Sequence, residues 1–113
     1  MATIGTRDEQ HQRFWDVAEP FIAQGRLVEG TMMGHQCLRS ASNDGFVATV
    51  ERRTGKLVVK LPEERVAELI AADDGDAFAP AKKVFKEWVA VRAFDERVWT
   101  GLIDESIRFV EGR

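Results

Sequence analysis

The residues best suited to chemistry in this sequence are His35 and Cys37, which lie two positions apart. In a strand both side chains would project from one face, where an imidazole could activate a thiolate or both groups could bind a metal ion. A zinc site needs about four ligands, and the only other Cys or His in the chain is His11. A buried thiol beside a polar strand residue is therefore the simpler interpretation. We expect no catalytic residue, no metal site and no cofactor.

Basic residues form a second candidate site. Lysine and arginine on a two-stranded ribbon can contact the phosphates of a nucleic acid. The candidate contacts are Arg39, Arg52, Arg53, Lys56, Lys60, Lys82, Lys83 and Lys86. Against this interpretation, the formal net charge is -3, and acidic runs occur at residues 63–64 and 73–76. Because a net acidic domain lacks the usual electrostatic footprint of a DNA-binding protein, protection of sheet edges against aggregation is the better supported role.

A third candidate site consists of large apolar side chains near the His35 segment. Trp88 is predicted to face away from the apolar residues of its own strand, which would leave it at a pocket or an interface. The residues assigned to such a site are Met33, His35, Cys37 and Trp88. If the helices cannot cover both faces of the sheet, a homodimer that buries Trp88 and Val58 is an alternative to a small-ligand pocket.

The element that must position these groups is a β-hairpin predicted over residues 45–61, with its turn at Thr54 and Gly55. A two-residue loop would pair Val50 with Val59, and a four-residue loop keeps the same parity. The face predicted to be apolar carries Phe46, Ala48, Val50, Leu57, Val59 and Leu61. The face predicted to be mostly polar carries Thr49, Glu51, Val58 and Lys60. The pattern therefore predicts a sheet that needs helices on one face only.

The first helix is predicted to begin with a capping box at Thr6 and Glu9 and to end at Gly25. Apolar residues follow at helical spacing between these ends and predict one buried stripe. Pro20 lies inside that stripe and removes a backbone hydrogen bond, so we expect a kink or a break in the helix there.

The remaining elements are a strand over residues 31–38, a helix from Pro62 to Gly75, a strand over 83–92 and a helix over 95–111. Gly34 is expected to mark a bulge or a close backbone approach in the first strand. The residues predicted to share one face of the strand over 83–92 are Phe85, Val89 and Val91. Together with the hairpin, these elements predict an α+β protein with two layers, in which helices cover one face of an antiparallel sheet.

Three segments carry a resemblance to the bacterial MmcQ/YjbR family and to the related TfoX N-terminal domain. They are LVVKLPEERVAELIA at 57–71, AFAPAKKVFKEWVAV at 77–91 and LIDESIRFV at 102–110. In addition, Met32 to His35 stand where TfoX-like chains carry a Met-Phe-Gly-Gly-like motif. The resemblance covers nearly the whole chain, and most of the matching residues are structural.

The resemblance implies the order α-β-β-β-α-β-β-α, with a further short strand near residues 78–82, in a single domain over 1–113. It also implies an association with DNA or with the regulation of competence for DNA uptake, and it brings no catalytic residues. The function we predict is therefore a non-enzymatic regulator that binds DNA. The alternatives are a homodimeric or protein-interaction adaptor and a small-ligand binder.

Size and composition limit the number of domains, the disulfide content and the cellular location that we expect. A chain of 113 residues is long enough for one domain with a real core. One cysteine excludes an internal disulfide and is typical of a reducing cytoplasm. The sequence has no apolar run long enough to span a bilayer and no visible secretory signal. We therefore expect a cytoplasmic protein that does not associate with a membrane.

Overall fold

A computed structural model describes residues 7–32, 34–79, 82–91 and 94–112, and the side chains from residue 11 onward within these ranges. The elements in chain order are α1 (Arg7–Ala23), β1 (Leu27–Met32), β2 (His35–Ser40), β3 (Phe46–Val50), β4 (Leu57–Lys60), α2 (Glu63–Ala71), β5 (Gly75–Phe78), β6 (Phe85–Val91) and α3 (Glu96–Glu111). The strands form one antiparallel sheet in the order β1-β2-β3-β4-β6-β5. The α+β class is confirmed.

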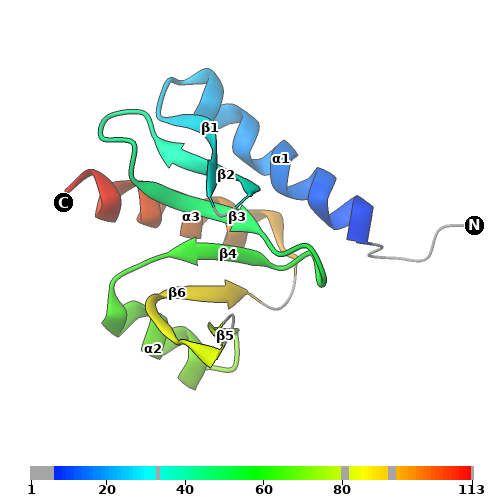
Figure 1. Ribbon diagram of the computed structural model, residues 1–113, viewed down its shortest axis with the longest axis vertical. Coiled ribbons are helices and arrows are strands. Elements are labelled where there is room, and N and C mark those ends of the chain that lie inside the picture. Colours follow the sequence, from blue (N-terminus) through cyan, green and yellow to red (C-terminus); the bar gives the residue numbers. More distant parts are fainter. Residues whose placement is uncertain (1–6, 33, 80–81, 92–93, 113) are drawn as a thin grey trace, which may run out of the picture.

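All three helices pack on one face of the sheet, as predicted. Their buried residues join those of the strands in one apolar core, which includes Phe14 of α1, Leu69 of α2 and Trp99 of α3. In Figure 1, α3 passes behind β3 and β4, and the other face of the sheet is turned toward the viewer. We call these the covered face and the open face. Among the described helices, none is long and apolar enough to cross a membrane.

The prediction of a single strand over residues 31–38 is wrong, because a tight turn divides this segment between two strands. Met32 pairs with His35 at the end of the β1–β2 hairpin. Gly34 has a φ of 80°, in the left-handed region that glycine tolerates best. Gly34 therefore marks a hairpin turn and not a bulge, and the sheet gains a strand beyond the order that the family resemblance implies.

Helix α1 is continuous through Pro20, so the predicted break is wrong. The helix ends three residues later in a C-terminal motif closed by two hydrogen bonds, from the Gly25 amide to the Ile22 carbonyl and from the Arg26 amide to the Phe21 carbonyl, each 3.0 Å long. Gly25 has a φ of 77°, which confirms its role as the stop. The predicted capping box begins at Thr6, which lies outside the described residues.

The β3–β4 hairpin exists, with the predicted parity and a different register. Val50 pairs with Leu57 instead of Val59, because the connection spans residues 51–56. Two hydrogen bonds close this turn, from the Gly55 amide to the Glu51 carbonyl and from the Glu51 amide to the Lys56 carbonyl, each 2.8 Å long. Since the shift is by two residues, the alternation of side chains between the faces is unchanged.

The prediction that Phe46 belongs to the covered face is wrong. The β2–β3 register shifts between the pairs Leu38–Ala48 and Arg39–Phe46, so Val47 is an extra residue in β3. An extra residue reverses the alternation on one side of it, and Phe46 therefore packs on the open face.

The open face is also more apolar than predicted. Val58 is fully buried there, and Phe85 packs there instead of beside Val89 on the covered face. The β5–β6 register shifts just before Phe78, which pairs with Phe85, and this irregularity accounts for the change of face. The placement of Trp88 opposite Val89 and Val91 is as predicted, and so is the assignment of Val58 and Thr49 to this face.

The C-terminal elements correct two predicted boundaries. Helix α2 ends at Ala71, and Gly75 begins β5 instead of ending the helix. A Cβ atom at Gly75 would lie 2.7 Å from Cγ2 of Val89, so the close approach of β5 and β6 requires glycine. Strand β5 supplies the short strand implied near residues 78–82, although the two overlap only at Phe78. Helix α3 matches its predicted range, and the Asp95 carboxylate caps it by accepting from the Val98 amide at 3.1 Å.

Candidate ligand-binding site

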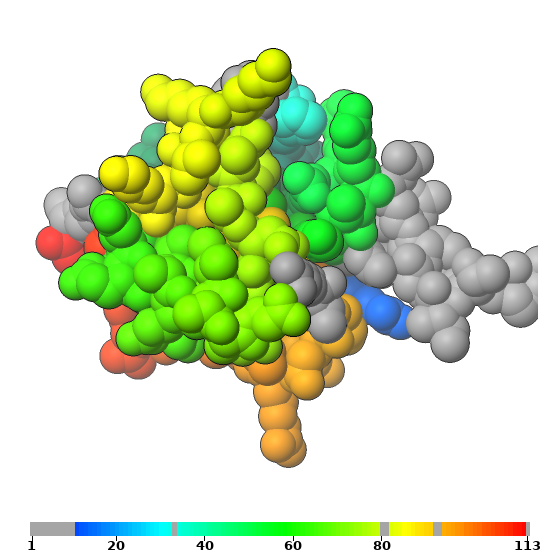
Figure 2. All heavy atoms as spheres, turned by 90° about the horizontal axis from the view of Figure 1, so that it is seen from below, coloured from blue at the N-terminus to red at the C-terminus, as the bar shows by residue number. Residues whose placement is uncertain are grey.

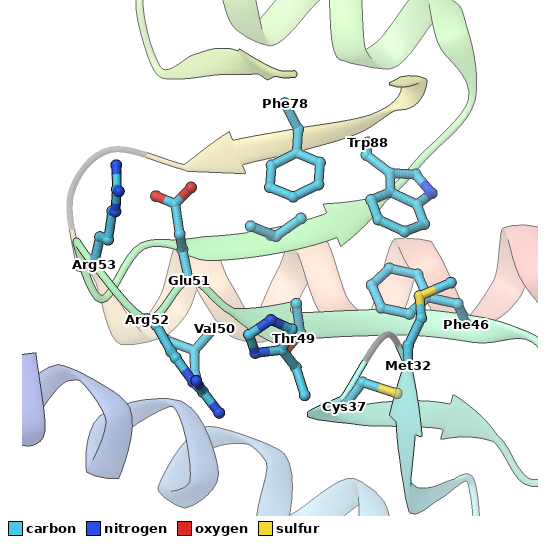
Figure 3. Close-up of a pocket in the computed structure, with 12 residues that line it drawn as sticks. Met32, Cys37, Phe46, Thr49, Val50, Glu51, Arg52, Arg53, Phe78 and Trp88 are labelled. Carbon is cyan, nitrogen blue, oxygen red and sulfur yellow. The ribbon is translucent and has the colours of Figure 1, made fainter. Parts of the chain in front are cut away.

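A cavity of about 340 Å³ opens on the open face of the sheet. Its floor is apolar and includes Phe46, Val58 and Trp88, and the side chains of Met32 and Phe78 border it. Figure 3 shows these side chains converging from β1, β3, β5 and β6, with Arg52 and Arg53 on the turn that follows β3. The described helix residues contribute nothing to this lining, because the helices cover the opposite face.

Stacked aromatic rings build the floor. The Trp88 ring centroid lies 4.4 Å from that of Phe46, 4.8 Å from that of Phe85 and 5.4 Å from that of Phe78, and all three pairs are stacked. These rings come from β3, β5 and β6, so strand pairing fixes their relative positions. Trp88 is only 8% exposed. The floor is therefore a rigid apolar surface rather than a set of free aromatic side chains.

Cys37 and His35 both line the cavity, as their spacing on one strand predicted. The Cys37 side chain is fully buried, whereas His35 is exposed. Burial raises the pKa of the Cys37 thiol, and the nearby Arg39 guanidinium opposes this effect only in part. A raised pKa keeps the thiol protonated, which is unfavourable for a nucleophile or a metal ligand. The described residues contain no group of three or more His, Cys, Asp or Glu that could hold a metal ion.

Two of the predicted nucleic-acid contacts are engaged within the fold. The Arg39 guanidinium donates to the carbonyls of Asp44 at 2.8 Å and Thr31 at 2.9 Å. Lys56 pairs with the Asp76 carboxylate at 3.2 Å. These two side chains therefore have less freedom to bind phosphates than their positions in the sequence indicated.

The other predicted basic contacts lie at three places. Arg52 and Arg53 are exposed on the β3–β4 turn, at the mouth of the cavity. Lys82 and Lys83 are exposed just before β6, and Lys86 is exposed within it. Lys60 is half-buried in β4, opposite Trp88. In Figure 2 the β3–β4 turn (green) and the β5–β6 segment (yellow) stand on either side of a notch in the surface.

Sequence reasoning assigned part of this site and missed the rest. Trp88, His35 and Cys37, which the sequence assigned to a pocket or an interface, line the cavity, and Met33 lies outside the described residues. Phe46 was missed because strict alternation assigned it to the covered face. Phe78 was missed because only the family resemblance implied a strand near it. The run of three apolar residues that begins at Phe46 breaks the alternation and was the available signal of a bulge.

A second hollow, of about 410 Å³, lies between α1 and α3 and is more polar. The Asp104 carboxylate at its edge accepts from Arg26 and Arg108, each at 2.9 Å. Burial alone would raise the pKa of Asp104, but the hydrogen bonds from Arg108 and Arg26 lower it below the ordinary range. Since both arginines are thus engaged with the fold, this hollow is a weaker candidate site than the cavity on the open face.

Comparison with known proteins returned no similar family model, no similar curated protein and no similar solved structure. The likeness to the MmcQ/YjbR family therefore stays a prediction from the sequence.

Proposed function

We propose that this protein binds a small, largely apolar molecule in the cavity on the open face. The observation that carries this proposal is an aromatic floor, built by paired strands, that no described helix covers. The cavity volume of about 340 Å³ lies at the lower end of the range of small-molecule sites, roughly 300–1,000 Å³. An apolar surface left open on a folded domain is typical of a binding site.

The polar groups of the lining favour an apolar ligand over a nucleobase. A base needs hydrogen bonds along its edge as well as a stacking surface. The Thr49 hydroxyl already donates to the Gln36 carbonyl at 2.7 Å, and Cys37 is a neutral, weakly donating thiol. The centre of the cavity therefore offers apolar contact and few free hydrogen-bonding groups.

A homodimer interface has less support than a ligand pocket. The main reason to expect a homodimer was that Trp88 would be an apolar side chain that only a partner could bury. Trp88 is 8% exposed in the single chain, so a partner would remove little further apolar surface at this residue. A concave site lined by Phe46 and Phe78 fits a small molecule better than a flat second copy.

Thr49 provides a matched pair of variants to test the proposal. It lines the cavity and is half-buried, so Thr49→Phe would place a ring in the cavity, whereas Thr49→Val removes only the hydroxyl. The probe is N-phenylnaphthylamine, a neutral apolar fluorophore. We expect saturable binding to the natural chain and to Thr49→Val, and at least tenfold weaker binding to Thr49→Phe. Thermal unfolding of all three proteins would establish that each is folded.

Equal binding to all three folded proteins would place the probe elsewhere and contradict the proposal. Absence of saturable binding to the natural chain would contradict it as well. In both cases the open face would have to be explained by contact with a macromolecule.

Nucleic-acid binding is the second candidate, because Arg52, Arg53, Lys82, Lys83 and Lys86 remain exposed around the same notch. Fluorescence anisotropy of labelled duplex DNA tests it, with Arg52→Glu/Arg53→Glu as the variant. Phosphate contacts predict binding that weakens steeply with salt and is lost in this variant. Binding that is absent at low salt, or unchanged in the variant, would contradict the candidate.

A further inference from the structure

We infer that the cavity selects ligands that carry an anionic group, and that Arg52 and Arg53 hold this group at the mouth. The ligand class is a hydrophobic carboxylate or a comparable organic anion, with its apolar part on the floor formed by Phe46 and Trp88. This inference rests on the proposed function, since it concerns the same cavity.

The β3–β4 turn holds the two arginines at the rim. They are consecutive, and both line the cavity while remaining exposed. Backbone hydrogen bonds from Gly55 to Glu51 and from Glu51 to Lys56 close the turn. The Thr54 hydroxyl adds a bond to the Glu51 carboxylate at 2.5 Å and accepts from the Lys56 amide at 3.2 Å. The turn is thus fixed by its own contacts, and neither arginine is needed to form them.

The charges at the mouth favour an anion. Glu51 is the only acidic residue among the described residues of the lining, and its carboxylate is the one that accepts from Thr54. Lys56, at the end of the same turn, pairs with the Asp76 carboxylate at 3.2 Å, so these two charges compensate one another. The described lining therefore carries two arginines and one glutamate, which leaves a net positive charge beside an apolar cavity.

The floor and the rim act on different parts of one ligand. A guanidinium group matches a carboxylate in a planar, bidentate contact, and nearby apolar surface lowers the effective dielectric constant and strengthens that contact. The apolar part of the same ligand would cover the floor that the helices leave open. A neutral apolar molecule would satisfy only the floor, and a small inorganic anion only the rim.

Two fluorescent probes with the same skeleton separate these contributions. N-phenylnaphthylamine is neutral, and anilinonaphthalene sulfonate carries a sulfonate on the same ring system. We expect the natural chain to bind the sulfonate more tightly. In Arg52→Gln/Arg53→Gln the Kd of the sulfonate should rise about three- to tenfold, as expected for two partly exposed ion pairs. The Kd of the neutral probe should change by less than about twofold, because the floor is intact.

Arg97→Gln/Arg108→Gln, on helix α3, is the matched control. Both residues are exposed, neither lines the cavity, and the variant loses the same two positive charges. We expect it to bind both probes like the natural chain, apart from a small effect of net charge. About 0.5 M salt should reduce the preference for the sulfonate in the natural chain, since exposed charges are screened over a few ångströms.

The outcomes distinguish this inference from the proposed function. If both probes bind the natural chain equally, or if the control variant weakens the sulfonate as much as the arginine variant, the anion preference is wrong and the apolar pocket stands. If neither probe binds, the proposed function itself fails. A preference that disappears only in Arg52→Gln/Arg53→Gln supports the inference.

Discussion

The two faces of the sheet are built from alternate residues of the same strands, yet they end in different environments. On the covered face, Trp99 and Ile103 of α3 pack against Val59 and complete a closed core. On the open face, Trp88 and its aromatic neighbours form an equally apolar layer that borders a cavity. Apolar burial stabilises a fold in proportion to the area removed from water. The covered face therefore provides most of the stability, and the open face is available for binding.

The largest effect is expected for Trp99→Ala on the covered face. Trp99 is 1% exposed and packs edge-to-face on Phe94, with ring centroids 4.9 Å apart. Truncation of a buried aromatic leaves a cavity and costs about 3–5 kcal/mol of the free energy of unfolding. Urea denaturation would measure this loss, and a loss below about 1 kcal/mol would contradict the closed core.

Trp88→Ala on the open face should cost less, about 2–3 kcal/mol. Trp88 already borders a cavity, so its removal forfeits contacts mainly on one side. The same denaturation experiment measures this loss, together with the binding of N-phenylnaphthylamine. We expect weaker binding in Trp88→Ala and unchanged binding in any Trp99 variant that remains folded. Equal losses of stability would show that the faces are equally closed in solution.

Removal of one hydroxyl from each face sharpens the comparison. Ser106 is buried and donates to the Val47 carbonyl at 3.1 Å, so Ser106→Ala should cost about 1–2 kcal/mol. Thr49 donates to the Gln36 carbonyl at 2.7 Å, in a bond that is exposed to water. Thr49→Val should therefore cost less than about 0.5 kcal/mol in thermal or urea unfolding. A reversed order would mean that the open face is less hydrated than the structure indicates.

An effect smaller than that of Ser106→Ala concerns the edge of the covered side, where Asp104 pairs with Arg26 and Arg108. Because the pKa of Asp104 is lowered in the folded chain, its contribution is present above the unfolded pKa and is lost as the pH falls through the folded value. Asp104→Asn should cost about 0.5–1 kcal/mol at pH 7, after allowance for solvent screening.

Urea denaturation of both proteins at neutral pH and at a series of lower pH values would test the sign, since the contribution is lost as the pH falls through the folded pKa of Asp104. We expect the difference between Asp104→Asn and the natural chain to shrink toward zero in acid. A difference that is independent of pH would show that the amide perturbs packing rather than charge.

The sequence correctly predicted the elements in which apolar residues recur at one regular spacing. The helix over 95–111 and the stop at Gly25 follow helical rules, and the structure confirms them. The β3–β4 hairpin retained its parity, although its turn is longer than the two-residue loop. The β1–β2 hairpin was missed, because a turn at Gly34 and a bulge at Gly34 give the same local sequence signal.

The open face could be predicted only in part, for a physical reason. One extra residue, Val47, places Phe46 beside Trp88, and an irregular pairing at Phe78 brings Phe85 to the same layer. Each shift depends on the partner strand, which local alternation does not identify. The position of the Arg39 side chain also depends on tertiary contacts, because its guanidinium group donates to the carbonyls of Thr31 and Asp44.

The strand order has a consequence for how the chain reaches this structure. Strands β1 to β4 pair with their neighbours in sequence, and β5 pairs with β6, so most strand pairs close short loops. Only the β4–β6 pairing joins segments separated by α2 and β5. Because loop closure costs more entropy as the loop lengthens, two locally formed units should arise first and their union should limit the folding rate. Folding kinetics should then respond most to substitutions at the β4–β6 seam, such as Val59 against Val89.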